Sequence, residues 1–292
     1  MRLFLALAEE LHFGRAARRM LLTQPALSQQ IRALEDRLGV DLLQRSSRRV
    51  ELTPAGHALV PEARALLMAL DHLQGVAATV ARVARGHLRL GAIGGEAAMP
   101  YTIAILSELA TRHPGVTVEI RTVDFVEQID LLTGGGIDAA FLRPPLPPFL
   151  RSLHLAAEPR IACLPANDPL VNQAPLTLAD LADHLVVDVP PEAPREWWDH
   201  WTINPRPDGT PVRFGPQVGN IEAMLLAVAR GQGITFLPAA ARHLYPRPGI
   251  AYVDVTDLPM STAALAWLPH RRDYPALTAL LQAARSVLAR SS

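Results

Sequence analysis

One segment restricts the fold of this chain more than any other, because the sequence from Pro54 to Ala84 predicts a single long helix with one apolar seam. The seam positions follow one another in alternating steps of four and three residues: Leu59, Ala63, Leu66, Leu70, Leu73, Ala77, Val80 and Ala84. A narrow heptad seam of this kind typically packs against a second helix. We therefore predict a dimer contact through the seam residues from Leu59 to Val80, with packing on the helix's own domain as the alternative.

The stretch before this helix is basic, although the whole chain is neutral with 28 basic and 28 acidic residues. Between Gly14 and Arg49 there are eight arginines and three acidic residues, a local net charge of +5. A basic patch on a neutral chain is typical of a nucleic-acid contact.

Three short helices are predicted in and before this basic stretch. Residues 2–12 have helical apolar spacing, Phe13-Gly14 interrupts them, and the letters RAARRMLL form a second helix. The third helix begins at the N-cap Thr23 and ends at Gly39. Its apolar stripe consists of Leu27, Ile31, Leu34 and Leu38. The opposite side presents Pro25, Ser28, Gln29, Arg32 and Asp36.

Two short extended runs follow Gly39, with the letters VDLLQR and RRVELT, and Ser46-Ser47-Arg48 joins them. They predict a hairpin with a basic tip. Attached to a helix-turn-helix unit, such a hairpin makes a winged helix-turn-helix.

The remainder of the chain alternates strands with helices. The predicted strands are HLRLGAI, VTVEIRTV, IDAAFLR, IACLP, HLVVDV, GITFLP and AALAWLP. The predicted helices are MPYTIAILSELATRH, EQIDLLTGG, LTLADLADH, IEAMLLAVARGQ and PALTALLQAARSVLA. This alternation predicts an α/β domain with a largely parallel sheet.

A set of motifs runs along nearly the whole chain. Residues 9–59 read EELHFGRAARRMLLTQPALSQQIRALEDRLGVDLLQRSSRRVELTPAGHAL, and HLRLG, RHPGV, GGGIDAAFLRPP and VARGQGITFLP follow in that order. In these motifs and their order the chain resembles the LysR-type transcriptional regulators, over residues 9–59 essentially without a gap. Relatives usually have a few more residues before the first helix, so either that helix is shortened here or the true start lies upstream of Met1.

The resemblance implies an α+β multi-domain protein in three parts. These are a winged helix-turn-helix over residues 1–53, a linker and dimerisation helix over 54–85, and a two-lobed α/β effector-binding domain of the periplasmic-binding-protein-like type 2 fold over 86–292. Lobe I would comprise about residues 86–157 and 266–292, and lobe II about 158–265. The implied partners are double-stranded operator DNA, a small-molecule effector, a homodimer or homotetramer, and RNA polymerase as a further candidate.

Residues of the third helix and of the hairpin are predicted to contact DNA: Thr23, Gln24, Pro25, Ala26, Ser28, Gln29, Arg32, Arg48 and Arg49. The Gln29 amide suits bidentate pairing with adenine, and Arg32 suits guanine or a phosphate. Thr23 and Gln24 are placed for phosphates at the helix start, whereas the hairpin arginines suit a narrow minor groove. Pro25 and Ala26 offer apolar contact to a thymine methyl group.

Other charged residues of the basic stretch are interpreted differently. Glu35 and Asp36 are read as scaffold beyond the groove-entering end, because a carboxylate pressed on phosphate is repelled. Arg15, Arg18 and Arg19 are read as DNA-backbone contacts or as solvent-facing side chains.

The predicted effector site draws on positions that match the resemblance: Gly94, Gly95, Glu96, Phe125, Gln128, Arg143 and Asn220. Arg143 suits a carboxylate ligand, or equally pairs with a nearby acid. Relatives often have a hydroxyl side chain where this chain has Gly95 and Phe125, and Glu96 adds a negative charge. An aromatic carboxylate is therefore less expected here than in the family at large.

Three tryptophans, Trp197, Trp198 and Trp201, lie in the predicted helix EWWDHW. They line a pocket or a subunit contact, or they form a helix face packed in the core. Core packing is the favoured interpretation.

The remaining chemistry-bearing residues predict no catalytic or metal site. Cys163 lies in an apolar strand and is interpreted as a buried structural thiol. The ten histidines show no HxxxH or HxH spacing, so no metal or cofactor is expected. No long uncharged segment follows Met1, which predicts a cytoplasmic protein.

Two other functions were weighed against a transcriptional regulator. A transporter's solute-binding protein predicts a signal peptide and no basic helical front end. An enzyme requires a clustered nucleophile and base, or a metal site. The sequence therefore favours a DNA-binding regulator that reads an interrupted palindrome and responds to a small molecule between its two lobes.

Overall fold

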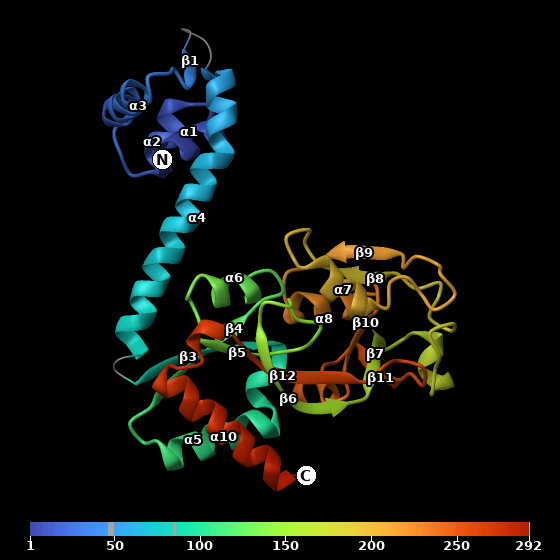
Figure 1. The fold of residues 1–292 in the computed structure, drawn as a ribbon. Coiled ribbons are helices and arrows are strands. Elements are labelled where there is room, and N and C mark those ends of the chain that lie inside the picture. Colours follow the sequence, from blue (N-terminus) through green and yellow to red (C-terminus); the bar gives the residue numbers. More distant parts are fainter. Residues whose placement is uncertain (46–49, 84–85, 292) are drawn as a thin grey trace. The chain divides into compact units, whose positions relative to one another are not determined.

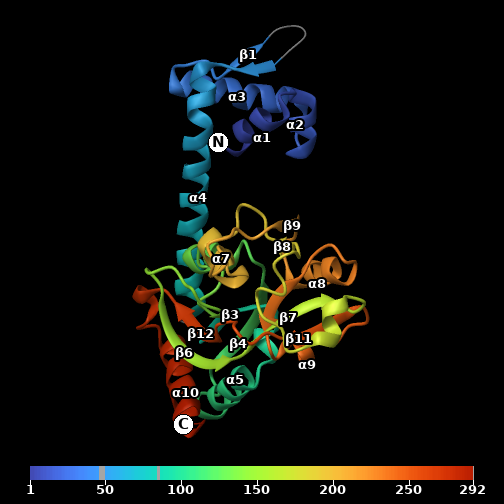
Figure 2. The ribbon, with the colours of Figure 1, turned by 90° about the vertical axis from the view of Figure 1, so that its right-hand side faces the viewer.

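The computed structural model describes residues 1–45, 50–83 and 86–291 (Figures 1 and 2). The chain divides into two compact units, Met1–Gly75 and Val76–Ser292.

The N-terminal unit is a small helical domain with a two-stranded hairpin (Figure 1). Its elements are α1 (Arg2–Glu10), α2 (Phe13–Arg19), α3 (Gln24–Leu38), β1 (Leu43–Arg45), β2 (Val50–Leu52) and the first part of α4 (Pro54–Val83). The two strands pair antiparallel, with Leu43 opposite Leu52. The core contains side chains that are almost fully buried: Phe4, Leu7, Leu27, Ile31 and Leu42. The predicted winged helix-turn-helix is confirmed in the described residues, and the predicted tip residues Arg48 and Arg49 lie outside them.

Helix ends in this unit follow from local hydrogen bonds. The predicted interruption between the first two helices is present, but it lies at Leu11-His12 and not at Phe13-Gly14. Nδ1 of His12 accepts hydrogen bonds from the backbone N–H groups of Gly14 and Arg15 at 3.1 and 3.2 Å, so that α2 begins at Phe13. The bounds of α3 agree with the prediction. Thr23 caps its start, and Gly39 ends it with a φ of 67°, in the left-handed region that glycine tolerates.

Helix α4 is continuous from Pro54 to Val83 and contains Pro61. The residues of its apolar seam differ in burial along the helix. Ala63 is only 1% exposed in the core of the N-terminal unit, and Leu59 also packs against that core, as in the alternative of packing on the helix's own domain. By contrast, Leu66, Leu70 and Leu73 are 53%, 41% and 64% exposed. The side chains of Ala77 and Val80 lie outside what the structure describes.

The C-terminal unit contains a five-stranded sheet with the order β4-β3-β5-β12-β6. These strands are β3 (His87–Ile93), β4 (Thr117–Val123), β5 (Ala139–Leu142), β6 (Arg151–Glu158) and β12 (Ser261–Trp267). Strand β3 is parallel to β4 and β5, whereas β12 is antiparallel to β5 and β6. Helices α5 (Pro100–Arg112) and α10 (Pro275–Ser291) pack against one face of this sheet (Figure 1).

A second group of strands belongs to the same unit. Strand β7 (Arg160–Pro165) lies between β10 (Thr235–Pro238) and β11 (Ile250–Asp254), antiparallel to both. Strand β8 (Val186–Asp188) pairs parallel with β9 (Phe214–Gln217). The helices that accompany these strands or join them to the first sheet are η1 (Gly94–Ala98), α6 (Gln128–Thr133), η2 (Pro169–Gln173), α7 (Arg195–Thr202), α8 (Ile221–Ala229), α9 (Ala241–Leu244) and η3 (Pro269–Arg271).

Three details differ from the prediction. The sheets are mixed rather than largely parallel, since β12 returns from the second group of strands and runs against β5. Because all of β12 pairs within the first sheet, the chain re-enters lobe I at Ser261, not at 266. The letters LTLADLADH form successive turns instead of a helix, where the Asp180 carboxylate accepts hydrogen bonds from both the backbone N–H and the hydroxyl of Thr177 at 2.7 Å.

Candidate functional site

The outward side of α3 is a shallow, polar surface hollow. It is lined by Pro25, Ser28, Gln29, Arg32, Ala33 and Asp36. Within the described part of the chain, the side chains of Gln29 and Arg32 have no hydrogen-bond or ion-pair partner, so both are free to bind another molecule. The side of α3 that the sequence predicts to face outward is therefore at the surface of the N-terminal unit.

The inward side of α3 differs in one respect from the predicted stripe. Leu27 and Ile31 are buried, but Leu38 is 40% exposed. Glu35 is buried instead, and its Oε1 accepts hydrogen bonds from the backbone N–H groups of Leu42 and Leu43 at 3.0 and 3.2 Å. The scaffold role is confirmed for Glu35, which joins α3 to the hairpin.

Asp36 does not share that role, because it is exposed and lines the same hollow as Gln29. The arginines of α2 are also held within the unit. Arg15 pairs with Glu10 at 3.1 Å, Arg19 pairs with Glu9 at 2.8 Å, and Arg18 donates to a carbonyl oxygen of its own helix. These ion pairs reduce the basic charge that the sequence count assigns to this stretch.

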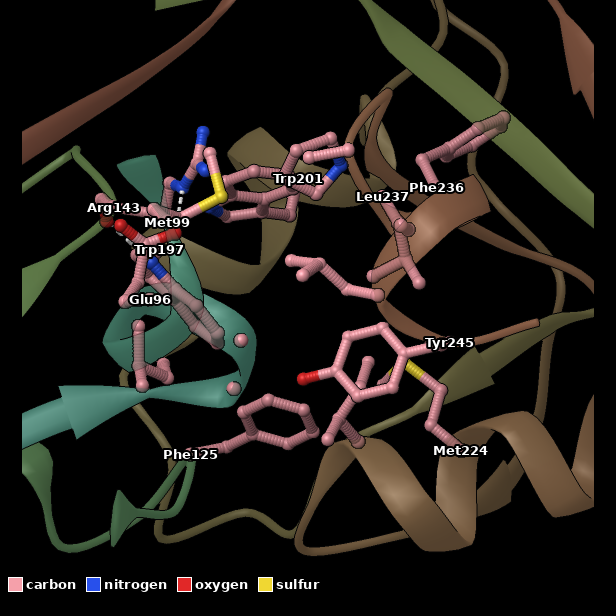
Figure 3. A pocket seen from close by; sticks show the side chains of 18 of the residues that line it. Glu96, Met99, Phe125, Arg143, Trp197, Trp201, Met224, Phe236, Leu237 and Tyr245 are labelled. Carbon is pink, nitrogen blue, oxygen red and sulfur yellow. Dashed lines mark hydrogen bonds and ion pairs between the residues drawn. The ribbon is translucent and has the colours of Figure 1, made fainter. Parts of the chain in front are cut away.

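The C-terminal unit contains a cavity that opens to solvent, with about 620 Å³ of empty space when the solvent at its mouth is included (Figure 3). It lies between the two groups of strands, because its walls come from η1, the ends of β3 to β5, and helices α7, α8 and α9. Five predicted effector residues line it: Gly94, Gly95, Glu96, Phe125 and Arg143.

Two predicted effector residues do not line the cavity. Gln128 is 2% exposed, and its side-chain amide donates to the carbonyl oxygen of Phe125 at 3.3 Å. Asn220 is exposed and caps α8, where its Oδ1 accepts the N–H of Ala223 at 2.9 Å. Both residues support elements beside the cavity and do not line it.

Aromatic side chains form one wall of the cavity. The ring centroids of Phe125 lie 5.7 and 6.0 Å from those of Trp197 and Trp198, and Trp197 lies 6.3 Å from Trp201. The three tryptophans are between 3% and 7% exposed. They are packed in the core, as favoured from the sequence, and the same packed face also lines the cavity.

A buried polar cluster closes another part of the wall. Arg143 is 5% exposed, and all three of its guanidinium nitrogens donate hydrogen bonds. Nε donates to Glu96 at 2.7 Å, Nη1 to Ser261 at 2.7 Å, and Nη2 to Glu158 at 2.8 Å and to the Tyr101 hydroxyl at 3.4 Å. Arg143 is therefore paired with acids, which was the alternative to a ligand anchor.

The electrostatics of this cluster are tightly coupled. Burial raises the pKa of Glu96, and the charge of Arg143 opposes that increase. Tyr101 donates to Glu96, and burial together with the charge of Glu96 raises the pKa of this phenol. The cluster thus holds its one cation against two carboxylates inside the protein.

Most of the remaining cavity residues were not predicted. The residues that were not predicted are Met99, Ile221, Met224, Phe236, Leu237, Pro238, Ala240, Ala241, Leu244 and Tyr245. Nearly all are apolar, and their pattern in the sequence is the same as that of core residues. Tyr245 is the exception, since a tyrosine just after a short helix presents a polar group that would have been a usable signal.

The structure also bears on Cys163, on possible metal ligands and on possible membrane-spanning helices. Cys163 lies in β7 with 0% exposure, and burial raises the pKa of its thiol. In the residues that the structure describes, no three His, Cys, Asp or Glu side chains are grouped so as to hold a metal ion. Within the same ranges, none of the helices has the length and apolarity that crossing a membrane requires.

Comparison with known families covers both units. Residues 1–57 match the family described as "Bacterial regulatory helix-turn-helix protein, lysR family", and residues 81–289 match the "LysR substrate binding domain". The chain is 35% identical over 244 residues to the HTH-type transcriptional regulator AlsR of Bacillus subtilis (strain 168), covering 83% of this chain and 80% of that protein. It is 34% identical over 283 residues to the HTH-type transcriptional regulator IlvR of Caulobacter vibrioides, covering 94% and 92%.

Solved structures agree with these matches. Full-length BenM has a TM-score of 0.56 at 27% identity and covers 99% of this chain and 96% of its own. Full-length CbnR in complex with its target DNA has a TM-score of 0.62 at 23% identity, covers 98% of each chain, and shares the fold.

The winged helix-turn-helix and the two-lobed unit with its cavity define a DNA-binding transcriptional regulator with an effector-binding domain. The chain belongs to the LysR family.

Proposed function

We propose that this regulator reads its operator with the outward side of α3 and responds to a small molecule in the cavity of the C-terminal unit. The observation that carries the proposal is the polar outward surface of the capped helix α3. On this surface the side chains of Gln29 and Arg32 have no hydrogen-bond or ion-pair partner among the described residues. Unpaired exposed side chains exchange water for base edges at little cost, and a bidentate contact of Gln29 to adenine specifies a base. Such a regulator acts where the chromosome is, in the cytoplasm.

The start of α3 positions this surface. The Thr23 hydroxyl accepts the N–H of Ala26 at 3.4 Å, and it still has a proton to donate to a phosphate oxygen. The preceding helix contributes little free charge, because Arg15 and Arg19 are paired with acids. Arg32 is therefore the cation of α3 that we expect to contribute most to DNA affinity.

The base-reading role of Gln29 is tested with a DNA-binding array. Gln29→Ala should relax the base preference and weaken binding to the specific sequence by about 1 to 3 kcal/mol. Gln30→Ala is the matched control, because Gln30 is also exposed but does not line the hollow. Unchanged specificity in the Gln29 variant would contradict the assigned role.

The proposal includes a homo-oligomer through the exposed part of the α4 seam. Leu66 and Leu70 line an apolar surface groove in the N-terminal unit, and Leu73 is also exposed. Light scattering tests this contact, since Leu66→Arg would place a charge in it and should yield monomers. Glu62→Arg adds an arginine at another exposed position of the same helix and should leave the oligomer intact. An intact oligomer in the Leu66 variant would refute the seam.

The response to a small molecule is tested by footprinting on the DNA that flanks the gene, with and without candidate effectors. Filling the cavity by Ala240→Trp should abolish a change in the footprint that a candidate produces, because Ala240 lines the cavity and is only half-buried. A response that persists in this variant would place the effector elsewhere.

A further inference from the structure

Among the described residues, one arginine lines the cavity, and all three of its guanidinium nitrogens already donate hydrogen bonds. Glu96, Ser261, Glu158 and Tyr101 surround the guanidinium of Arg143 at hydrogen-bond distance. A carboxylate ligand would have to displace one of these partners, and the displaced acid would then stay buried without its cation. Such a loss costs several kcal/mol.

The net charge of this wall also opposes an anion. Arg143 carries one positive charge, and Glu96 and Glu158 each carry a negative one when ionised. The cluster is therefore negative, or neutral once Glu96 binds a proton. A ligand carboxylate would enter beside two acids instead of facing a free cation.

The part of the wall that Trp201 forms is unfavourable to a cation. The guanidinium of Arg160 lies 4.6 Å from the centre of the Trp201 ring, and Arg160 is only 2% exposed. In the described structure its hydrogen bonds go to the carbonyl oxygens of His200 and Trp201 and to no carboxylate. The positive charge behind Trp201 is thus not neutralised locally, and it repels a second cation placed against the other face of the ring.

The Tyr245 hydroxyl is a polar group on the cavity wall. Figure 3 shows it pointing into the cavity toward η1, and it has no hydrogen-bond partner among the described residues. Burial raises the pKa of this phenol to about 12, so at neutral pH it keeps its proton to donate.

Gly95 makes room for this hydroxyl. A Cβ at Gly95 would lie 3.1 Å from the Tyr245 oxygen and 2.8 Å from Cδ1 of Leu244. A side chain at Gly95 would therefore crowd the Tyr245 hydroxyl in its present position. The donor that faces the ligand comes from beside α9 instead of from the loop after β3.

We propose that the cavity selects an uncharged, largely apolar molecule with a hydrogen-bond acceptor, such as a ketone, aldehyde or ester, and that Tyr245 donates to this acceptor. The proposal rests on the assignment of the cavity as the effector site and names the chemical class that the site takes. The aromatic wall binds the apolar body of the ligand, and the two flanking charge centres exclude ions of either sign.

The first test compares three probes of nearly the same shape by ligand-observed NMR with the full chain: acetophenone, benzoate and benzamidinium. Acetophenone should bind about tenfold or more tightly than either ion, because an unpaired charge is costly to bury. Equal or tighter binding of benzoate or benzamidinium would overturn the proposal.

The second test isolates the hydrogen bond. Tyr245→Phe should weaken acetophenone binding by about threefold to tenfold, the size of one hydrogen bond. Ethylbenzene lacks the acceptor, so its affinity should not change in this variant. Tyr274→Phe is the matched control, because Tyr274 packs in the separate core beside α10 and should leave both affinities unchanged. Equal losses for both probes, or no loss for acetophenone, would contradict a donor role for Tyr245.

The cavity-filling variant Ala240→Trp separates this proposal from the assignment of the site. If benzoate binds best and Ala240→Trp abolishes its binding, the cavity is the binding site and the proposed ligand class is wrong. If acetophenone binds equally well to the native chain and to the Ala240 variant, its site lies elsewhere, and both the ligand class and the assigned cavity fail.

Discussion

The outward side of α3 and the wall of the effector cavity both contain polar side chains, but in opposite states. On α3, the side chains of Gln29 and Arg32 have no partner among the residues that the structure describes. In the cavity, Arg143 and Glu96 are buried and bound to each other. Water satisfies an exposed polar group until a ligand arrives, whereas a buried group needs a partner inside the protein. A charged residue type therefore indicates a ligand contact on a surface more reliably than in a cavity.

Removing the buried cation should produce the largest effect. Arg143→Met leaves Glu96 and Glu158 without their positive partner, and we expect the free energy of unfolding to fall by about 3 to 5 kcal/mol. All four tryptophans are in the C-terminal unit, so urea unfolding followed by their fluorescence reports on it. Arg121→Met is the control, because its ion pair with Glu127 is exposed and is expected to contribute less than about 1 kcal/mol. Equal losses of stability in the two variants would show that the buried ion pairs of Arg143 contribute no more than the exposed ion pair of Arg121.

The difference between buried and exposed charge is also present within α3, at Glu35 and Asp36. Glu35→Ala leaves the N–H groups of Leu42 and Leu43 without their acceptor and should destabilise the N-terminal unit by about 1 to 3 kcal/mol. The neighbouring Asp36→Ala should change stability by less than about 0.5 kcal/mol, because Asp36 is exposed. Thermal unfolding followed by circular dichroism measures both, and a larger effect at Asp36 would reverse the assignment of the two acids.

Two arginines of the N-terminal unit should differ in DNA binding although their charges are the same. Arg32→Ala should weaken binding by about 1 to 3 kcal/mol. Arg19 is held by Glu9 at 2.8 Å, so Arg19→Ala should cost less than about 1 kcal/mol. Fluorescence anisotropy at several salt concentrations measures both effects. A fall of about 0.9 in the salt slope for the Arg32 variant would identify a phosphate contact instead of a base contact. Equal losses would show that the ion pair of Arg19 opens on DNA.

The smallest expected effect is at Cys163. Its thiol is buried in β7 and its pKa is raised, so little reactive thiolate forms in the folded protein near neutral pH. Iodoacetamide should leave Cys163 unmodified in native buffer and alkylate it in urea, as measured by mass spectrometry. Alkylation without loss of the native fluorescence would show that the β7 region opens locally.

Several parts of the structure were predictable because their signals are local. The bounds of α3 follow from Thr23 and Gly39, and the outward position of Gln29 follows from the helical period. The failures also have physical causes. The strand β6 was missed because its letters RSLHLAAE contain no β-branched residue, and Leu155 is the one buried residue of this strand. Ala63 packs inside its own unit although it belongs to the heptad seam, because the seam shows which side of a helix is apolar and not which surface covers that side.

The sequence by itself determined the winged helix-turn-helix, the long helix, the family and the outward polar side of α3, because helical periods and capping residues act over a few neighbours. Only the tertiary structure decided how the cavity is lined and which of its charges are available. Arg143 meets Glu96 and Ser261 across separations of 47 and 118 residues, and no local pattern specifies such pairs. The fold brings them together, and burial then requires them to satisfy one another, so that the Tyr245 hydroxyl is left facing the cavity.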